Sequence, residues 1–165
     1  MSPAHLPPPP PGVPVDCSLT GLAPGFRARL TDMLDAFRRD GFDARIAETL
    51  RTDARQRFLY GFGREYDDGR GVVTHSQDAD ETWHHFGLAA DVVHATLEWN
   101  APRTFWDALG WHALNARLTW GGDWRHPALP HVQFGAPMRD SPSPRAARLL
   151  ASGGMEAVWR EVGAA

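Results

Sequence analysis

The stretch TWHHFGLAAD, residues 82–91, decides how this chain is interpreted. The apolar run over residues 88–93 predicts a buried strand that contains a single acid, Asp91. His84 precedes that strand across Gly87, a residue suited to a tight turn. An imidazole and a carboxylate on either side of such a turn can be aimed at one point, and both are good Zn²⁺ ligands. A structural interpretation is also open, because a buried Asp can pair with an Arg and an interior His with a backbone carbonyl.

A second motif is WGGDW, residues 120–124, which is followed by His131. A catalytic zinc usually has three protein ligands and an open fourth position. His84, Asp91 and His131 would make a complete set of two histidines and one carboxylate. All but one of the histidines and all but one of the tryptophans lie between His75 and His131. We therefore expect any chemistry to lie in this part of the chain.

A third group of residues begins at Arg51 and includes Gln56. A guanidinium fixed near a metal can hold a substrate carboxylate or stabilise a developing oxyanion, because its forked donors match both. Taken alone, an Arg at the start of a helix is more often a surface residue or a member of a structural ion pair.

Length and composition exclude several classes of protein. The 165 residues fit one domain, and 17 Lys+Arg against 20 Asp+Glu lack the basic excess of a nucleic-acid binder. Cys17 is the only cysteine, which excludes an intrachain disulfide and a Cys-rich zinc finger. No apolar stretch approaches the roughly 18 residues of a membrane span. We expect a monomer with no nucleic-acid partner and no membrane span.

The first 16 residues differ in composition from the rest of the chain. They hold half of the 14 prolines, which predicts an extended, disordered leader over residues 1–16 and a single domain over 17–165. The leader lacks the basic start and apolar segment of a signal peptide, so the localisation is left open.

Hydrophobic periodicity predicts helices and strands that are interspersed without a regular repeat. The expected helices lie between Pro24 and Gly41, over residues 52–60, from Pro102 onward, and, as two weak helices, around Ala146 and Glu156. The expected strands cover residues 42–47 and lead to Thr49, then residues 72–74, 88–93, 118–120 and 131–134. This order predicts an α+β domain with a small, mostly antiparallel sheet flanked by helices.

Together, five stretches resemble the VanY-type zinc peptidases, which include D-alanyl-D-alanine carboxypeptidases and phage L-alanyl-D-glutamate endolysins. The stretches are LRTDARQRFLYGFGR (50–64), GVVT (71–74), TWHHFGLAAD (82–91), LTWGGDW (118–124) and PHVQF (130–134). They follow one another in unbroken order over about half of the chain. The resemblance implies a small α+β fold of the hedgehog/D-Ala-D-Ala carboxypeptidase type. It also implies Zn²⁺ as cofactor and the peptides of cell-wall peptidoglycan as substrate.

The resemblance also implies roles for individual residues. It makes His84, Asp91 and His131 the zinc ligands, and Arg51 the residue that contacts the substrate or its polarised carbonyl. Thr82 stands where the family usually has Ser, and its hydroxyl would orient the peptide. Gln56, five residues after Arg51, is expected to contribute to substrate binding.

One position departs from the family pattern. These enzymes usually carry Glu or Asp three residues before the last His ligand, as the general base, and here that position is Ala128. The segment from Trp124 to His131 is also one residue shorter than the common form. Because alanine cannot accept a proton, Asp123 becomes the nearest acidic candidate for the catalytic base, with His126 behind it.

The sequence thus leaves three hypotheses. The first is a zinc peptidase that acts on peptidoglycan peptides. The second is a catalytically weakened relative that serves as a cell-wall-binding or inhibitory module. The third is a structural domain without a metal.

Overall fold

The computed structural model describes residues 6–135 and 141–165. Within them, four strands form one antiparallel sheet in the order β1-β2-β4-β3. The strands are β1 (Ala44–Glu48), β2 (Ala89–His94), β3 (Leu118–Trp120) and β4 (His131–Phe134). The helices are α1 (Pro24–Arg39), α2 (Asp53–Gly61), α3 (Arg103–Asn115) and α4 (Pro144–Val162). Three short 3₁₀ helices, η1 (Ala79–Glu81), η2 (Trp83–Phe86) and η3 (Gly121–Asp123), complete the fold. The expected α+β class with an antiparallel sheet is confirmed.

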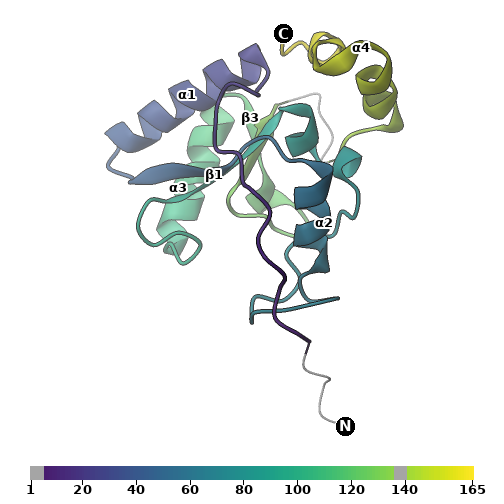
Figure 1. The fold of residues 1–165 in the computed structure, drawn as a ribbon. Coiled ribbons are helices and arrows are strands. Elements are labelled where there is room, and N and C mark those ends of the chain that lie inside the picture. Colours follow the sequence, from purple (N-terminus) through teal and green to yellow (C-terminus); the bar gives the residue numbers. More distant parts are fainter. Residues whose placement is uncertain (1–5, 136–140) are drawn as a thin grey trace.

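Helix α1 supplies much of the hydrophobic core. Pro24 occupies its first turn, where a missing backbone N–H costs nothing. Its buried side chains recur at helical spacing and are Phe26, Leu30, Met33, Leu34 and Phe37. The helix contacts α3 and β1, while α3 contacts β3 (Figure 1). α1 and α3 therefore form one apolar side of the domain, and α2 lies away from them. The C-terminal end of α4 reaches the start of α1, where Gly25 N donates to the carbonyl of Ala164 at 2.8 Å.

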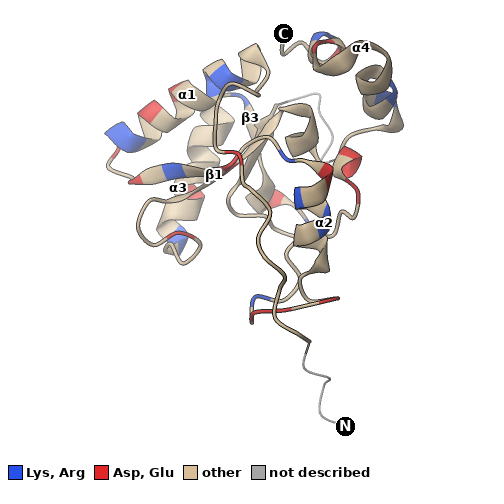
Figure 2. Ribbon diagram, viewed as in Figure 1, with Lys and Arg blue, Asp and Glu red and all other residues tan. Residues whose placement is uncertain are grey.

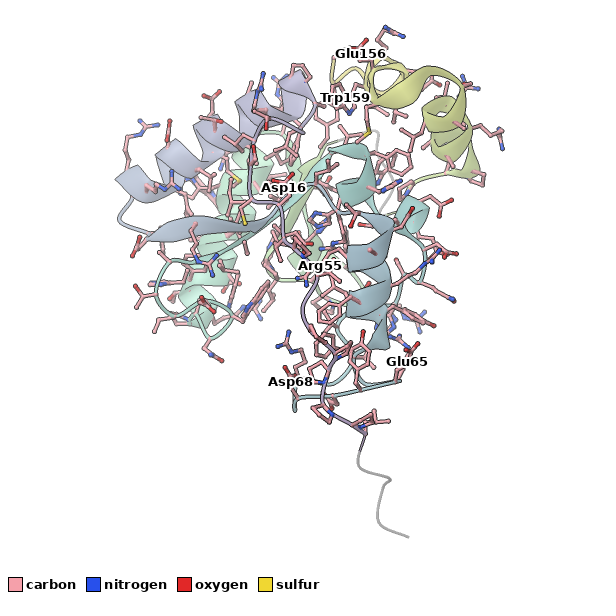
Figure 3. The ribbon with its side chains drawn as sticks, in the orientation of Figure 1. Asp16, Arg55, Glu65, Asp68, Glu156 and Trp159 are labelled. Atoms are coloured by element: carbon pink, nitrogen blue, oxygen red, sulfur yellow. The ribbon has the colours of Figure 1, made fainter. Side chains whose placement is uncertain are left out.

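Helix α4 carries a break at Gly154, whose φ of 69° and ψ of −172° are not helical. The two helical segments expected around Ala146 and Glu156 are both present, joined across this kink. Trp159 anchors the second segment, because its indole Nε1–H donates to the carbonyl of Phe86 at 2.7 Å (Figure 3). The C-terminal helix is thereby tied to η2, the element that carries His84.

The strand predicted for residues 72–74 is wrong. That segment has no regular secondary structure, and Val72 and Val73 are 48% and 42% exposed. A β-branched run needs a neighbouring strand for its backbone hydrogen bonds, and in the described part of the chain none pairs with this one.

The N-terminal segment makes contacts where the structure describes it. The carbonyl of Pro7 accepts from Asp67 N at 3.0 Å, and that of Asp16 accepts from Thr49 N at 2.7 Å. The disorder expected of the leader stays a prediction.

Charged residues of both signs are scattered over the elements in one view of the molecule (Figure 2). The described helices include none with the length and apolar character that crossing a bilayer requires.

The sheet register places three polar residues in one row. Asp91 on β2 lies opposite His131 on β4. An irregularity between Ile46 and Glu48 shifts the register of β1 and brings Glu48 opposite Asp91. Directly paired residues on antiparallel strands have side chains on the same face, and such bulges can re-aim a side chain. Glu48, Asp91 and His131 therefore form a row across three strands.

Candidate metal centre

Three of the side chains singled out by sequence converge at one point. His84 Nε2 lies 3.3 Å from Asp91 Oδ1, and His131 Nδ1 lies 3.4 Å from the same oxygen. The two ring nitrogens are 3.2 Å apart. All three residues are buried, and they form the one group among the described residues with metal-ligand potential.

Each histidine has one inner ring nitrogen that faces the cluster and one outer ring nitrogen that points away from it. The hydrogen-bond partners of the outer nitrogens determine the tautomers of both rings. His84 Nδ1 lies 2.7 Å from the carbonyl oxygen of Thr49, which can only accept, so this nitrogen is the protonated one. His131 Nε2 lies 3.0 Å from Gln133 Oε1, and with the amide oxygen so placed the imidazole must again donate. Each inner nitrogen then presents a lone pair. Two lone pairs and a carboxylate oxygen facing one another attract a cation.

The dimensions of this triangle match zinc. In a tetrahedral site with Zn–N and Zn–O distances of about 2.0–2.1 Å, two ligand atoms lie about 3.3–3.4 Å apart. The observed separations run from 3.2 to 3.4 Å. Hydrogen bonds that orient the non-ligating nitrogens are also usual in zinc proteins. The residues present therefore fit a zinc ion with a fourth position left open.

Electrostatics favour the ligand forms of these groups. Burial lowers the pKa of His84, and the nearby Arg51 charge lowers it further, so the neutral imidazole prevails. Burial alone would raise the pKa of Asp91. The positive charge of Arg51, whose Nη2 lies 3.2 Å from Asp91 Oδ2, acts against burial, and the pKa of Asp91 lies well below its usual range. The carboxylate is thus ionised.

Arg51 joins the cluster to a second buried carboxylate. Its Nη2 lies 3.2 Å from Asp91 Oδ2 and 2.7 Å from Glu48 Oε2. Glu48 Oε1 in turn accepts from Arg55 Nε at 3.1 Å, at the start of α2 (Figure 3). The Nε–H of Arg51 is buried and has no acceptor among the described residues.

Both structural interpretations weighed from the sequence hold here together with the metal geometry. Asp91 does pair with an Arg, and His84 does meet a backbone carbonyl. These contacts use the outer atoms of the two side chains. The inner atoms remain directed at each other, which the structural interpretation alone does not explain.

Gln56 and Thr82 support the site from either side. Gln56 is fully buried, its Oε1 accepts from Arg51 Nη1 at 3.2 Å, and its Nε2 donates to the carbonyl of Ser76. Thr82 caps η2, since its Oγ1 accepts from His84 N, and its hydroxyl hydrogen can still be donated. Direct contact of either residue with a substrate stays a prediction.

Asp123 lies outside the three-residue cluster. It is exposed and lines a groove beside α3 together with Trp120 and Trp124. Ala128 lies in the turn before β4, where its carbonyl accepts from His131 N at 3.1 Å. The ring of Trp124 packs against that of His131, with centroids 4.9 Å apart. The role of Asp123 as the base stays a prediction.

Comparison with known proteins gives a match by structure alone. No family model and no curated protein sequence matches the chain. The structure is similar to DacB from Streptococcus pneumoniae D39, with a TM-score of 0.52, 19% identity, and coverage of 71% of this chain and 68% of DacB. The chain shares its fold with DacB. The fold expected from the sequence resemblance is thereby confirmed.

Two further solved structures give lower scores. One is the L-Ala D-Glu endopeptidase ChiX of Serratia marcescens, with a TM-score of 0.49 and 22% identity, covering 70% of this chain and 82% of ChiX. The other is the E175A mutant of the D,D-pentapeptidase VanY from a VanB-type resistance cassette, solved with Zn(II). Its TM-score is 0.49 at 17% identity, and it covers 92% of this chain and 93% of VanY.

Sequence reasoning missed Glu48 and Gln133. Gln133 follows His131 by two positions on the same strand, so alternation places both on one face, and this signal was readable. Glu48 was harder to find from the sequence, because simple alternation along β1 does not reveal the register shift that brings this residue opposite Asp91.

Proposed function

We propose that this chain is a zinc-dependent peptidase that hydrolyses peptides of bacterial peptidoglycan. The observation that carries the zinc assignment is the triangle of His84 Nε2, Asp91 Oδ1 and His131 Nδ1 at the spacing of tetrahedral ligands. The ordered sequence motifs support the substrate class.

A zinc ion held by these three residues would polarise the scissile carbonyl and lower the pKa of water toward neutrality. Arg51 has its planar group fixed by Glu48, Asp91 and Gln56, and its guanidinium charge would stabilise a substrate carboxylate or the developing oxyanion. Thr82 would donate its hydroxyl hydrogen to the peptide. Trp124 covers one side of His131 and limits access of water there.

The residue that accepts the proton differs from the family pattern, because Ala128 stands where the resemblance implies Glu or Asp. Asp123, on the loop that follows β3, is the proposed acceptor. The bond that is cleaved, whether at the end of a peptide or within it, is set by the shape of the cleft beyond the metal.

Ala128 favours a second candidate function. With no carboxylate at this position, the chain can hold zinc and bind a peptide while turning it over slowly, as a cell-wall-binding or inhibitory module. Loss of a general base commonly costs about 10²- to 10⁴-fold in rate, and the Lewis acidity of a metal is unaffected by that loss.

Metal analysis combined with digestion of purified peptidoglycan tests both functions. The enzyme hypothesis predicts one zinc per chain and released D-alanine or peptide, both abolished in His131→Ala. One zinc per chain without any released product would reject catalysis and favour the binding module. Absence of zinc would reject both.

A further inference from the structure

Glu48 is a buried carboxylate outside the triangle of candidate metal ligands. It is 5% exposed, and the register shift in β1 brings it opposite Asp91. Burying a carboxylate is costly, and the cost is offset only by close partners of opposite charge. The partners of Glu48 therefore indicate what it does beside the centre.

Both oxygens of Glu48 contact arginine side chains. Oε2 accepts from Arg51 Nη2 at 2.7 Å, and Oε1 accepts from Arg55 Nε at 3.1 Å. The same Nη2 of Arg51 lies 3.2 Å from Asp91 Oδ2. The charges therefore alternate in sign along one row that ends at the triangle, in the order Arg55, Glu48, Arg51 and Asp91.

Arg51 is shared unequally between the two carboxylates. A terminal guanidinium nitrogen carries two hydrogens, so Nη2 can donate one to each carboxylate. The contact with Glu48 is the shorter, at 2.7 Å against 3.2 Å for Asp91. Because a charge-assisted hydrogen bond weakens as it lengthens, Glu48 holds the guanidinium more firmly than Asp91 does.

This sharing affects Asp91, since an arginine often binds a carboxylate through two parallel hydrogen bonds that engage both oxygens. In the structure Oδ2 of Asp91 takes the Arg51 contact, while Oδ1 lies 3.3 Å from His84 Nε2 and 3.4 Å from His131 Nδ1. The charge of Glu48 also offsets that of Arg51, which would otherwise repel a divalent cation at the triangle.

We propose that Glu48 is a positioning residue of the metal centre, which holds Arg51 to a single contact with Asp91 and so keeps Asp91 Oδ1 free to bind the metal. The inference rests on the proposed function, which takes zinc as the ion. It goes beyond that function, because Glu48 acts through Arg51 and is not a ligand. The charge of Glu48 should therefore matter for zinc affinity only while Arg51 is present.

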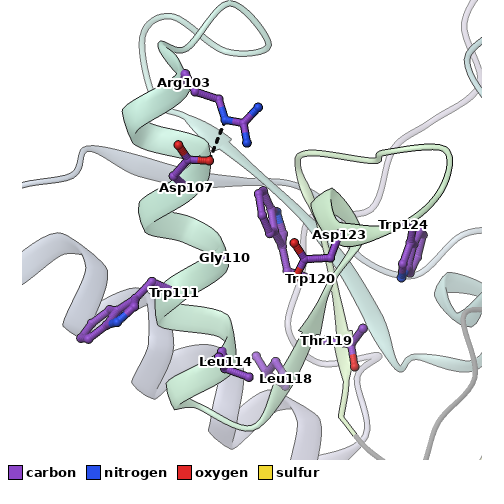
Figure 4. A pocket seen from close by; sticks show the side chains of 10 residues that line it. All are labelled: Arg103, Asp107, Gly110, Trp111, Leu114, Leu118, Thr119, Trp120, Asp123 and Trp124. Carbon is purple, nitrogen blue, oxygen red and sulfur yellow. Dashed lines mark hydrogen bonds and ion pairs between the residues drawn. The ribbon is translucent and has the colours of Figure 1, made fainter.

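Zinc affinity, measured by competition with a chromophoric chelator, tests this without any hydrolysis. Glu48→Gln keeps the size of the side chain and removes its charge, which leaves Arg51 to pair with Asp91 alone. Zinc affinity should fall about tenfold, the lower end of the range for changes around a ligand. Asp107→Asn is the matched control, because it also takes a carboxylate from an arginine, Arg103, at 2.6 Å on the exposed side of α3 (Figure 4). This control should change zinc affinity by less than about twofold.

A second background separates positioning from a purely structural role. In Arg51→Gln the guanidinium is gone, so adding Glu48→Gln should change zinc affinity by less than about twofold. Circular dichroism of each metal-free variant checks that it is folded. If Glu48→Gln does not fold, Glu48→Asp replaces it, because this variant keeps the charge and shortens the reach to Arg51. Its zinc affinity should fall about threefold.

Native zinc affinity in the folded Glu48 variant, or an equal loss with and without Arg51, would overturn the positioning role and leave the proposed function standing. If the native chain binds no zinc, the proposed function fails and this inference fails with it.

Discussion

Two sides of the candidate centre, one formed by strands β2 and β4 and the other by the loop between β3 and β4, differ in how many of the expected functional side chains they hold. On the strand side, Asp91 and His131 stand opposite each other in a rigid register, and each has an outer hydrogen-bond partner. On the loop side, residues 121–130 bring Ala128 next to His131 and leave Asp123 exposed. Two of the three candidate ligands are therefore built into the sheet and the third lies on η2, while the proposed proton acceptor lies on the connection between β3 and β4.

This difference shows which property is the more robust to change. Ligands on paired strands are positioned by backbone hydrogen bonds, so their geometry survives substitutions elsewhere. A loop tolerates changes in length and composition far more easily. The triangle of His84, Asp91 and His131 can therefore stay complete even where the neighbouring loop carries Ala128.

Removing a strand-side ligand should have the largest effect. His131→Ala leaves two of the three ligands. Zinc affinity should therefore fall further than the about 10- to 100-fold that is typical when a hydrogen-bond partner of a ligand is removed. Gln133→Ala removes the hydrogen-bond partner of His131, and the resulting loss of zinc affinity should lie within that range. Competition with a chromophoric chelator measures both. Equal affinities for the native chain and His131→Ala would show that the metal is held elsewhere.

Adding a carboxylate to the loop between β3 and β4 should have the next largest effect, and it acts on the rate of hydrolysis. Ala128→Asp should raise peptide hydrolysis by about 10- to 100-fold, since a positioned base contributes 10²- to 10⁴-fold and the shortened loop will not place it ideally. Zinc affinity should stay unchanged. In the native chain, Asp123→Asn should lower the rate by a similar factor. A rate that neither substitution alters would reject Asp123 as the acceptor and point to another group.

Glu48 tests how far the strand side depends on charge balance. Glu48→Gln leaves the buried Arg51 with one carboxylate partner fewer, so unfolding free energy should fall by about 2 kcal/mol, somewhat below the 3–5 kcal/mol seen when a buried pair is broken outright. Urea unfolding of the metal-free protein measures the change. The matched control is Glu98→Gln, which breaks the exposed pair with Arg45 and should cost less than about 0.5 kcal/mol. Equal losses would mean that Glu48 is no more important than a surface carboxylate.

The pH dependence of the metal-free protein should show the smallest effect. His84 has a lowered pKa in the fold, so between that value and the unfolded value of about 6.5 the unfolded chain binds the extra proton. Stability should therefore decrease as pH falls from 7 to 5. Asp91, whose pKa is also lowered, adds a further loss as pH falls through about 4. Melting temperatures in the presence of a chelator check this, and a melting temperature that rises on acidification would contradict it.

Much of the fold followed from local pattern. The apolar periodicity of α1 and the apolar run of β2 are strong signals, because each repeats a burial preference over several residues. Residues 72–74 show the limit of this reasoning. Val72 and Val73 favour a strand, but a strand forms only where another chain segment is placed to pair with it, and pairing is not encoded locally.

The amino-acid sequence by itself determined the donor types and their order, two imidazoles and one carboxylate among motifs of recognisable spacing. The tertiary structure decided that their inner atoms meet at 3.2–3.4 Å, which requires the register of β2 with β4 and the placement of η2. It also decided that Glu48 faces the site and that the ring of Trp124 packs against that of His131. These relations join residues far apart along the chain, and only packing of the whole domain fixes such distances.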